Sequence, residues 1–173
     1  MSMLRAIATL TAALVLGLSA LGGAATAAPS TGTGYPAGQC TAYVASELSW
    51  IPSNWGDADT WLIDARGAGL TTLTGADVGA VQPGDVAVIA GGAHTDNGRA
   101  SDDGHVGIVT AIDPAASTVT LSSANWPEGD PTPTSLVFAT SDIEGYVVPP
   151  TGLSLPVSVS ATSLATSPGG PHS

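Results

Sequence analysis

Positively charged side chains are almost absent from this 173-residue chain. It contains no lysine and only three arginines, against 14 Asp and Glu, which gives a formal net charge of −11 at pH 7. Binding to a nucleic-acid backbone needs many cationic contacts to phosphates, and docking on anionic lipid needs basic clusters. The composition therefore excludes nucleic acid and an anionic membrane surface as the main partners.

Cysteine is also scarce, because Cys40 is the only one. One cysteine excludes an internal disulfide framework and a Cys-rich zinc site. The hydrophobic fraction of 43% and the length exclude a disordered acidic chain and predict one globular domain. The 22 glycines and 13 prolines favour short strands and turns over long helices.

The N-terminal segment is typical of a secretory signal peptide. Arg5 gives a positive start, an apolar run follows through Leu21, and small residues lead to Ala28. The alternative is a membrane anchor, but the apolar run is shorter than the roughly 20 residues that span a bilayer. We expect residues 1–28 to be removed and the mature protein to be secreted, extracellular or in the cell wall, where Cys40 has no partner within the chain.

Four segments follow from composition. After the signal peptide, residues 29–34 form a short linker, residues 35–150 carry the globular domain, and residues 151–173 are a Ser/Thr/Pro-rich tail. We expect the mature protein to be a monomer.

The first half of the domain shows helical spacing. Apolar positions from Cys40 to Leu48 lie on one helical face, and a second short helix is predicted over residues 59–68 with Trp61, Leu62 and Ala65 facing inward. From Val81 onward the period changes to two, and four strands are predicted over residues 85–90, 105–112, 118–125 and 145–148. Residues 91–103 are predicted as a loop. Helices followed by an antiparallel sheet define an α+β fold.

Three residues form a candidate catalytic set: Cys40 at a helix start, His105 at a strand start and Asn125 at the end of the next strand. A thiol nucleophile needs a base, and a third group must fix the tautomer of the histidine. A helix N-terminus and an imidazolium both lower a thiol pKa, so we expect Cys40 to have thiolate character.

The spacing of the last two residues supports this set. If Ile112 pairs with Thr118 across the connection 113–117, an antiparallel ladder places His105 opposite Asn125 on the same face of the sheet.

The domain resembles the CHAP family (cysteine, histidine-dependent amidohydrolase/peptidase). The similarity rests on an ordered set of motifs: Tyr-Pro-Ala-Gly-Gln-Cys-Thr-Ala-Tyr at 35–43, Trp-Gly-Asp-Ala at 55–58, Pro-Gly-Asp-Val at 83–86, Gly-His-Val-Gly-Ile-Val at 104–109, Asn-Trp at 125–126 and Gly-Tyr-Val at 145–147. The resemblance implies a papain-like fold and a peptidoglycan hydrolase, an amidase or an endopeptidase, acting through a thioester. It also implies Cys40 as nucleophile, His105 as general base and acid, and Asn125 as the residue that orients His105.

Further positions are assigned to substrate and oxyanion binding. Gln39 lies where it can contribute to an oxyanion site together with the backbone N–H of Cys40. Trp55 and Trp126 are candidates for lining a substrate groove, although two or more of the four tryptophans are expected in the core. Many family members carry Glu two residues before the Asn, and this chain has Ser123 there, which leaves Asn125 as the evident third member.

Simpler interpretations exist for each residue. Cys40 can fill the core, His105 can be an ordinary strand histidine, and Asn125 can begin a turn. The acidic loop with Asp96, Asp102 and Asp103 has oxygen ligands that a calcium ion could use, but it lacks EF-hand spacing, so a solvated loop is favoured. No metal and no cofactor is assigned, and calcium binding by this loop stays open. Two alternatives to a hydrolase remain: a catalytically weak module that binds cell wall or a partner, and a secreted toxin or inhibitor with an intermolecular disulfide. The sequence leaves open which peptidoglycan bond is cut.

Overall fold

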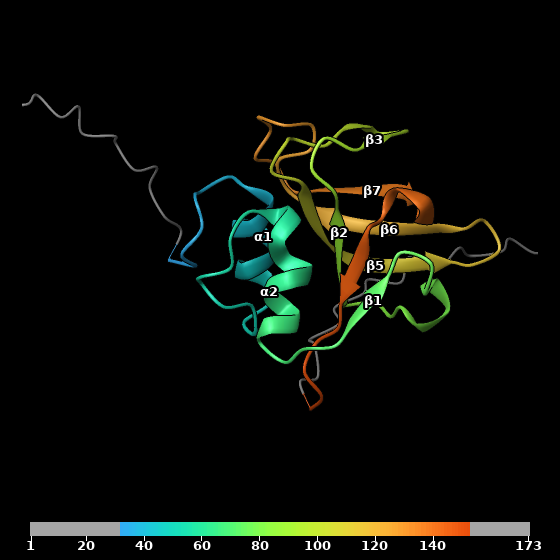
Figure 1. The fold of residues 1–173 in the computed structure, drawn as a ribbon. Helices are drawn as coiled ribbons and strands as arrows, with labels where there is room; N and C mark the ends of the chain where they lie inside the picture. Colours follow the sequence, from blue (N-terminus) through green and yellow to red (C-terminus); the bar gives the residue numbers. More distant parts are fainter. Residues whose placement is uncertain (1–31, 153–173) are drawn as a thin grey trace, which may run out of the picture.

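The computed structural model describes residues 32–152. The proposed signal peptide, half of the linker and almost all of the Ser/Thr/Pro-rich tail lie outside the described residues. In the described residues, two short α-helices precede the strands and pack together against the sheet (Figure 1). The predicted α+β class is confirmed. None of the described helices is long and apolar enough to cross a membrane.

The helices form close to where the spacing predicted them. Helix α1 spans Cys40–Glu47, and helix α2 spans Trp61–Gly67 after a 3₁₀ turn, η1, at Ala58–Thr60. Helix α1 buries Cys40 and Val44, and Leu48 just beyond its end is also buried. Helix α2 buries Trp61, Leu62 and Ala65, as predicted.

The strands in the described part of the chain form a six-stranded sheet in the order β1-β8-β2-β5-β6-β7, and every neighbouring pair is antiparallel. Strands β2, β5, β6 and β8 match the four predicted ones. The bounds of the six are Thr72–Thr74 for β1, Val86–Ile89 for β2, His105–Asp113 for β5, Thr118–Ser123 for β6, Thr134–Ala139 for β7 and Gly145–Val147 for β8. Two further 3₁₀ turns, η2 and η3, cover Val78–Ala80 and Thr140–Asp142.

Residues 91–103 were predicted as a loop, and this prediction is wrong in part. The segment contains a small hairpin, β3 at His94–Thr95 and β4 at Gly98–Arg99. The Gly and Asn residues of this segment are typical of turns and loops, so its composition did not predict the two short strands.

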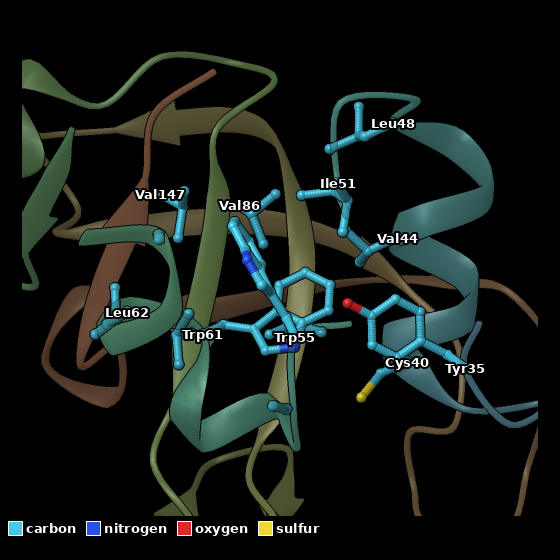
Figure 2. Packing of buried hydrophobic residues seen from close by; sticks show 14 of the residues in the cluster. Tyr35, Cys40, Val44, Leu48, Ile51, Trp55, Trp61, Leu62, Val86 and Val147 are labelled. Carbon is cyan, nitrogen blue, oxygen red and sulfur yellow. The ribbon is translucent and has the colours of Figure 1, made fainter. Parts of the chain in front are cut away.

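Two hydrophobic clusters lie on the two faces of the sheet, because side chains alternate along each strand. On the helix side, Val86 and Val88 of β2 pack with Val44 and Trp61, as Figure 2 shows for Val44, Trp61 and Val86. On the other side, Ala87 and Ile89 pack with residues of β6, β7 and β8. Both faces of β2 are buried, which explains why its sequence is apolar without alternation.

The pairing of β5 with β6 contains a bulge that the sequence did not reveal. Ile112 pairs with Val119 and not with Thr118, so the predicted pairing at the turn is wrong by one residue. A register shift between Val109 and Ala111 then brings Ile108 opposite Ser122. The pairing of Ile108 with Ser122 agrees with the predicted register. The bulge therefore corrects the one-residue error at the turn before β5 reaches His105.

Candidate active site

Helix α1 and strand β5 bring Cys40 and His105 to one pocket. Cys40 is the first residue of α1 and His105 is the first residue of β5. Both line a pocket of about 210 Å³. Its wall comes from the segments before and in α1, the turn before α2, the end of the β3–β4 hairpin segment and the loop after β6: Pro36, Gln39, Cys40, Thr41, Asp57, Ala58, Arg99, Ser101, Asp103, Gly104, His105, Asn125, Trp126 and Glu128.

Cys40 lies at the border between the helix-side cluster and this pocket. It is 5% exposed and belongs to the hydrophobic cluster, where Figure 2 shows it at one edge. Burial raises the pKa of the Cys40 thiol, although the backbone N–H groups of Val106, Thr41 and Cys40 itself oppose the shift. The expected thiolate character is therefore wrong for the free protein. Desolvation raises the Cys40 pKa by more than the helix N-terminus lowers it.

His105 forms a hydrogen bond with Ser123, which was not among the predicted site residues. Its Nε2 lies 2.9 Å from Oγ of Ser123, and both side chains are buried. Burial lowers the pKa of His105 to about 4. The ring is therefore neutral at pH 7, and the resting pair is a neutral thiol with a neutral imidazole.

The position of Ser123 follows from the strand register. In the register that pairs Ile108 with Ser122, position 125 would lie opposite His105, and Ser123 is two residues away on the same face. A side chain at this diagonal position can reach a histidine ring. Ser123 was predicted only to leave the site without a Glu, although its place on the same strand face as His105 was a signal in the sequence for this contact.

Asn125 is brought to the pocket but makes other contacts. Strand β6 ends at Ser123, and Asn125 adopts a left-handed backbone conformation with φ 62°. Its Nδ2 donates to Gln39 Oε1 at 2.8 Å, and its Oδ1 accepts from the Gly129 N–H at 2.6 Å. Asn125 as the residue that orients His105 stays a prediction, while the hydrogen bond to the ring is made by Ser123.

The two tryptophans predicted at a substrate groove occupy different places. Trp126 lines the pocket, with its ring edge-on to His105 at 4.8 Å between centroids and its Nε1 donating to Asn97. Trp55 lies in the core, packed edge-on against Trp61 at 5.3 Å, and it is not among the residues that line the pocket. The structure thus gives Trp55 a packing role.

Gly104, directly before His105, is fixed by close backbone approach. Its φ is +78°, and a Cβ there would lie 2.8 Å from the Asp59 nitrogen and 2.9 Å from the Ile89 oxygen. The Asp59 N–H donates to the Asp103 carbonyl at 3.0 Å, which ties the turn before α2 to the start of β5. Glycine is therefore required at position 104, directly before His105.

The acidic loop shows no metal-binding geometry in the described part of the chain. Residues 32–152 contain no group of three or more His, Cys, Asp or Glu that could hold a metal ion. Asp102 pairs with Arg99 at 2.5 Å. The residues that line the pocket supply the thiol of Cys40, the imidazole of His105, side-chain amides, hydroxyls and charged groups of both signs.

With this geometry in view, comparison with known proteins identifies the family. The model of the CHAP domain matches residues 30–125, which is more than half of the chain and includes Cys40, His105 and Asn125. The chain belongs to the CHAP family.

Comparison with solved structures gives only distant similarity. One match is the crystal structure of Ly7917, with 20% identity and a TM-score of 0.39, covering 59% of this chain and 41% of that one. Another is the crystal structure of Ly7917 with the hydrolyzing product of MDP, with 19% identity and a TM-score of 0.44, covering 70% and 58%. This chain thus spans about two fifths to three fifths of these structures. No curated protein matches the chain.

Proposed function

We propose that the chain is a cysteine hydrolase that cleaves an amide bond of bacterial peptidoglycan. The observation that carries the proposal is the meeting of Cys40, at the start of α1, with His105, at the start of β5, in one pocket, with His105 Nε2 against Ser123 Oγ. Membership of the CHAP family supports the hydrolase class and the substrate. The order of a helix nucleophile followed by a strand histidine is that of papain-like hydrolases, and we propose this relationship as well.

The reaction begins with proton transfer, because both partners are neutral at rest. For His105 Nδ1 to accept the thiol proton, Nε2 must carry its hydrogen and donate it to Ser123 Oγ. As the proton leaves, Cys40 Sγ attacks the amide carbon and the carbonyl oxygen becomes an oxyanion. The C–N bond then breaks, His105 returns the proton to the leaving amine, and a thioester remains on Cys40.

Water completes the cycle. His105 takes a proton from the attacking water, the water oxygen adds to the thioester carbon, and the C–S bond breaks. The proton returns to the sulfur, so that the free thiol and a carboxylic acid are the products. In both steps we propose that the Cys40 N–H and the Gln39 side chain donate to the oxyanion, because both residues line the pocket.

This chemistry suits both the sugar–peptide amide and the peptide bonds of the stem and cross-bridge. We also propose that the protein is secreted after loss of residues 1–28 and acts as a monomer in the cell wall or outside the cell. The alternative is a weak or inactive CHAP-like module that binds the wall through the same pocket.

Mass spectrometry of fragments released from purified sacculi tests the proposal. We expect new amine and carboxylate ends that appear with the parent and not with His105→Ala, and the fragment masses identify the bond. Binding to sacculi without any released fragment, by a folded parent protein, would support the binding module and contradict hydrolysis.

A further inference from the structure

The orientation of the Asn125 side chain is set by a backbone group. The Gly129 N–H can only donate, and it donates at 2.6 Å to Asn125 Oδ1. The other end of the amide is therefore Nδ2, which can only donate. The usual ambiguity between the oxygen and nitrogen of an Asn side chain is removed by this contact.

The orientation of the Asn125 amide also determines the orientation of the Gln39 amide. The Nδ2 of Asn125 lies 2.8 Å from the Gln39 side chain, so the atom that faces it must be the acceptor Oε1. The remaining atom of Gln39 is the donor Nε2, which has no hydrogen-bond partner within residues 32–152. Gln39 is also the N-cap residue of α1, and its side chain makes no capping hydrogen bond. The side chain is thus held from the loop after β6 and not by its own helix.

Gln39 lies where the orientation of its side-chain amide can affect the proposed reaction. Gln39 precedes the proposed nucleophile directly and lines the same pocket. An oxyanion formed on the carbonyl that Cys40 attacks needs donors, and an acceptor oxygen in the same place would repel it. Pro131, in the loop that also carries Gly129, packs against Gly38, where an added Cβ would come within 3.2 Å. The two segments therefore lie in close contact.

We propose that Asn125 is a positioning residue that acts through Gln39: it holds the Gln39 amide with its N–H groups available to the oxyanion. This assignment rests on the proposed hydrolase function and refines it. The ring contact of His105 is made by Ser123 instead. In this assignment Gln39 binds the oxyanion, Asn125 positions Gln39, and Ser123 orients the base His105.

The substitution Asn125→Asp separates this role from one on His105. Aspartate keeps an acceptor for the Gly129 N–H and tolerates the backbone at φ 62°. It cannot donate to Gln39, so the Gln39 amide turns over, gives its N–H to the carboxylate and leaves its oxygen toward the pocket. We expect the maximal rate of sacculus solubilisation to fall by about a hundredfold to a thousandfold, since one oxyanion donor is lost. A carboxylate beside His105 would instead preserve the rate and move the acid limb of the pH profile upward.

The double variant Gln39→Ala/Asn125→Asp shows whether the effect passes through Gln39. We expect Asn125→Asp to change the rate less than about threefold in the Gln39→Ala background, because coupled residues are not additive. Asn125→Gly keeps the left-handed backbone and removes both side-chain bonds, so it serves as a second variant in the same cycle if the aspartate variant does not fold. Iodoacetamide alkylation of Cys40 at pH 9 needs no oxyanion site, and we expect it to stay within about twofold of the parent.

Three results would overturn the inference: an Asn125→Asp rate within about twofold of the parent, the same loss in both Gln39 backgrounds, or an upward shift of the acid limb. A Cys40→Ala control distinguishes this failure from failure of the proposed function. If Cys40→Ala is inactive, a failed cycle rejects only the role of Asn125. If Cys40→Ala retains activity, the hydrolase mechanism itself is rejected.

Discussion

Burial of the imidazole fixes the charge state in which His105 enters the reaction. Its pKa is lowered to about 4, so the ring is neutral and able to accept a proton above that pH. The pH dependence of kcat/KM reports the ionisations of the free enzyme. We expect activity to fall as the pH drops through about 4, well below the ordinary histidine value of 6.5. An acid limb near 6.5, measured with the parent protein on sacculi, would show that His105 is more solvated than the structure has it.

The hydroxyl of Ser123 is the group that holds the ring. Ser123→Ala removes a buried partner from His105 Nε2 at almost constant volume. We expect the maximal rate to fall by about tenfold or more, because the ring loses its orientation and a buried N–H loses its partner. Circular dichroism checks that the variant is folded. A folded Ser123→Ala protein with the parental rate would mean that another group orients the ring.

A carboxylate at position 123 tests the electrostatics of the same contact. In Ser123→Glu a carboxylate faces the ring and stabilises the imidazolium, so the His105 pKa rises and the acid limb of the pH profile moves to higher pH. Ser123→Gln is the matched control, because it has a similar size and no charge. Equal acid limbs in the two variants would exclude a charge effect at this position.

At the scale of elements, the start of β5 depends on Gly104. Gly104→Ala places a Cβ against the backbone of Asp59 and Ile89 at a φ of +78°. Gly69→Ala is a matched control, since its φ is +79° and nothing lies within 4 Å of the added Cβ. We expect Gly69→Ala to lower the free energy of unfolding by about 1–2 kcal/mol and Gly104→Ala to lower it by clearly more. Urea denaturation measures both, and equal losses would mean that the backbone around Gly104 yields to the added carbon.

The same scale shows what the sequence could predict. Helix α1 and strands β5 and β6 were predictable because Val44, Val106 and Leu121 lie at the period of their elements. Strand β2 was predictable as a short apolar run that follows a turn. Strand β7 was missed: Val137 is exposed on it while Phe138 is buried, and the strand follows a stretch rich in Pro, Gly and Asp. The bulge in β5 was not predictable from the local sequence, since it depends on the pairing of β5 with β6.

The site was predictable to a similar degree. Residue type and order led to Cys40 and His105, because few residue types can supply a nucleophile and a base. The contact between His105 and Ser123 depends on the strand register, and the turn of Asn125 toward Gln39 depends on where β6 ends. The direction of the Cys40 pKa shift depends on burial, which sequence spacing does not give.

At the scale of the whole molecule, we expect net charge to govern how the proposed hydrolase approaches an anionic wall. All 14 acidic residues lie within residues 32–152 together with only Arg66 and Arg99, a formal charge of −12. Repulsion from anionic wall polymers is screened over roughly 8–10 Å at moderate salt. We expect the rate on intact walls to rise or stay level as sodium chloride increases from low to moderate concentration. A steep fall would reveal attraction through a cationic patch, and soluble wall fragments of low charge serve as the control.

The measurement that tests the central claim most directly is the rate of sacculus solubilisation by Cys40→Ser beside the parent. Serine is nearly isosteric with cysteine, so the fold should persist, and circular dichroism verifies it. A hydroxyl is a far weaker nucleophile than a thiolate in this site, and removal of a nucleophile from a coupled set costs on the order of a thousandfold or more. We predict a loss of that size. Residual activity within about tenfold of the parent would contradict the assignment of Cys40 as the nucleophile.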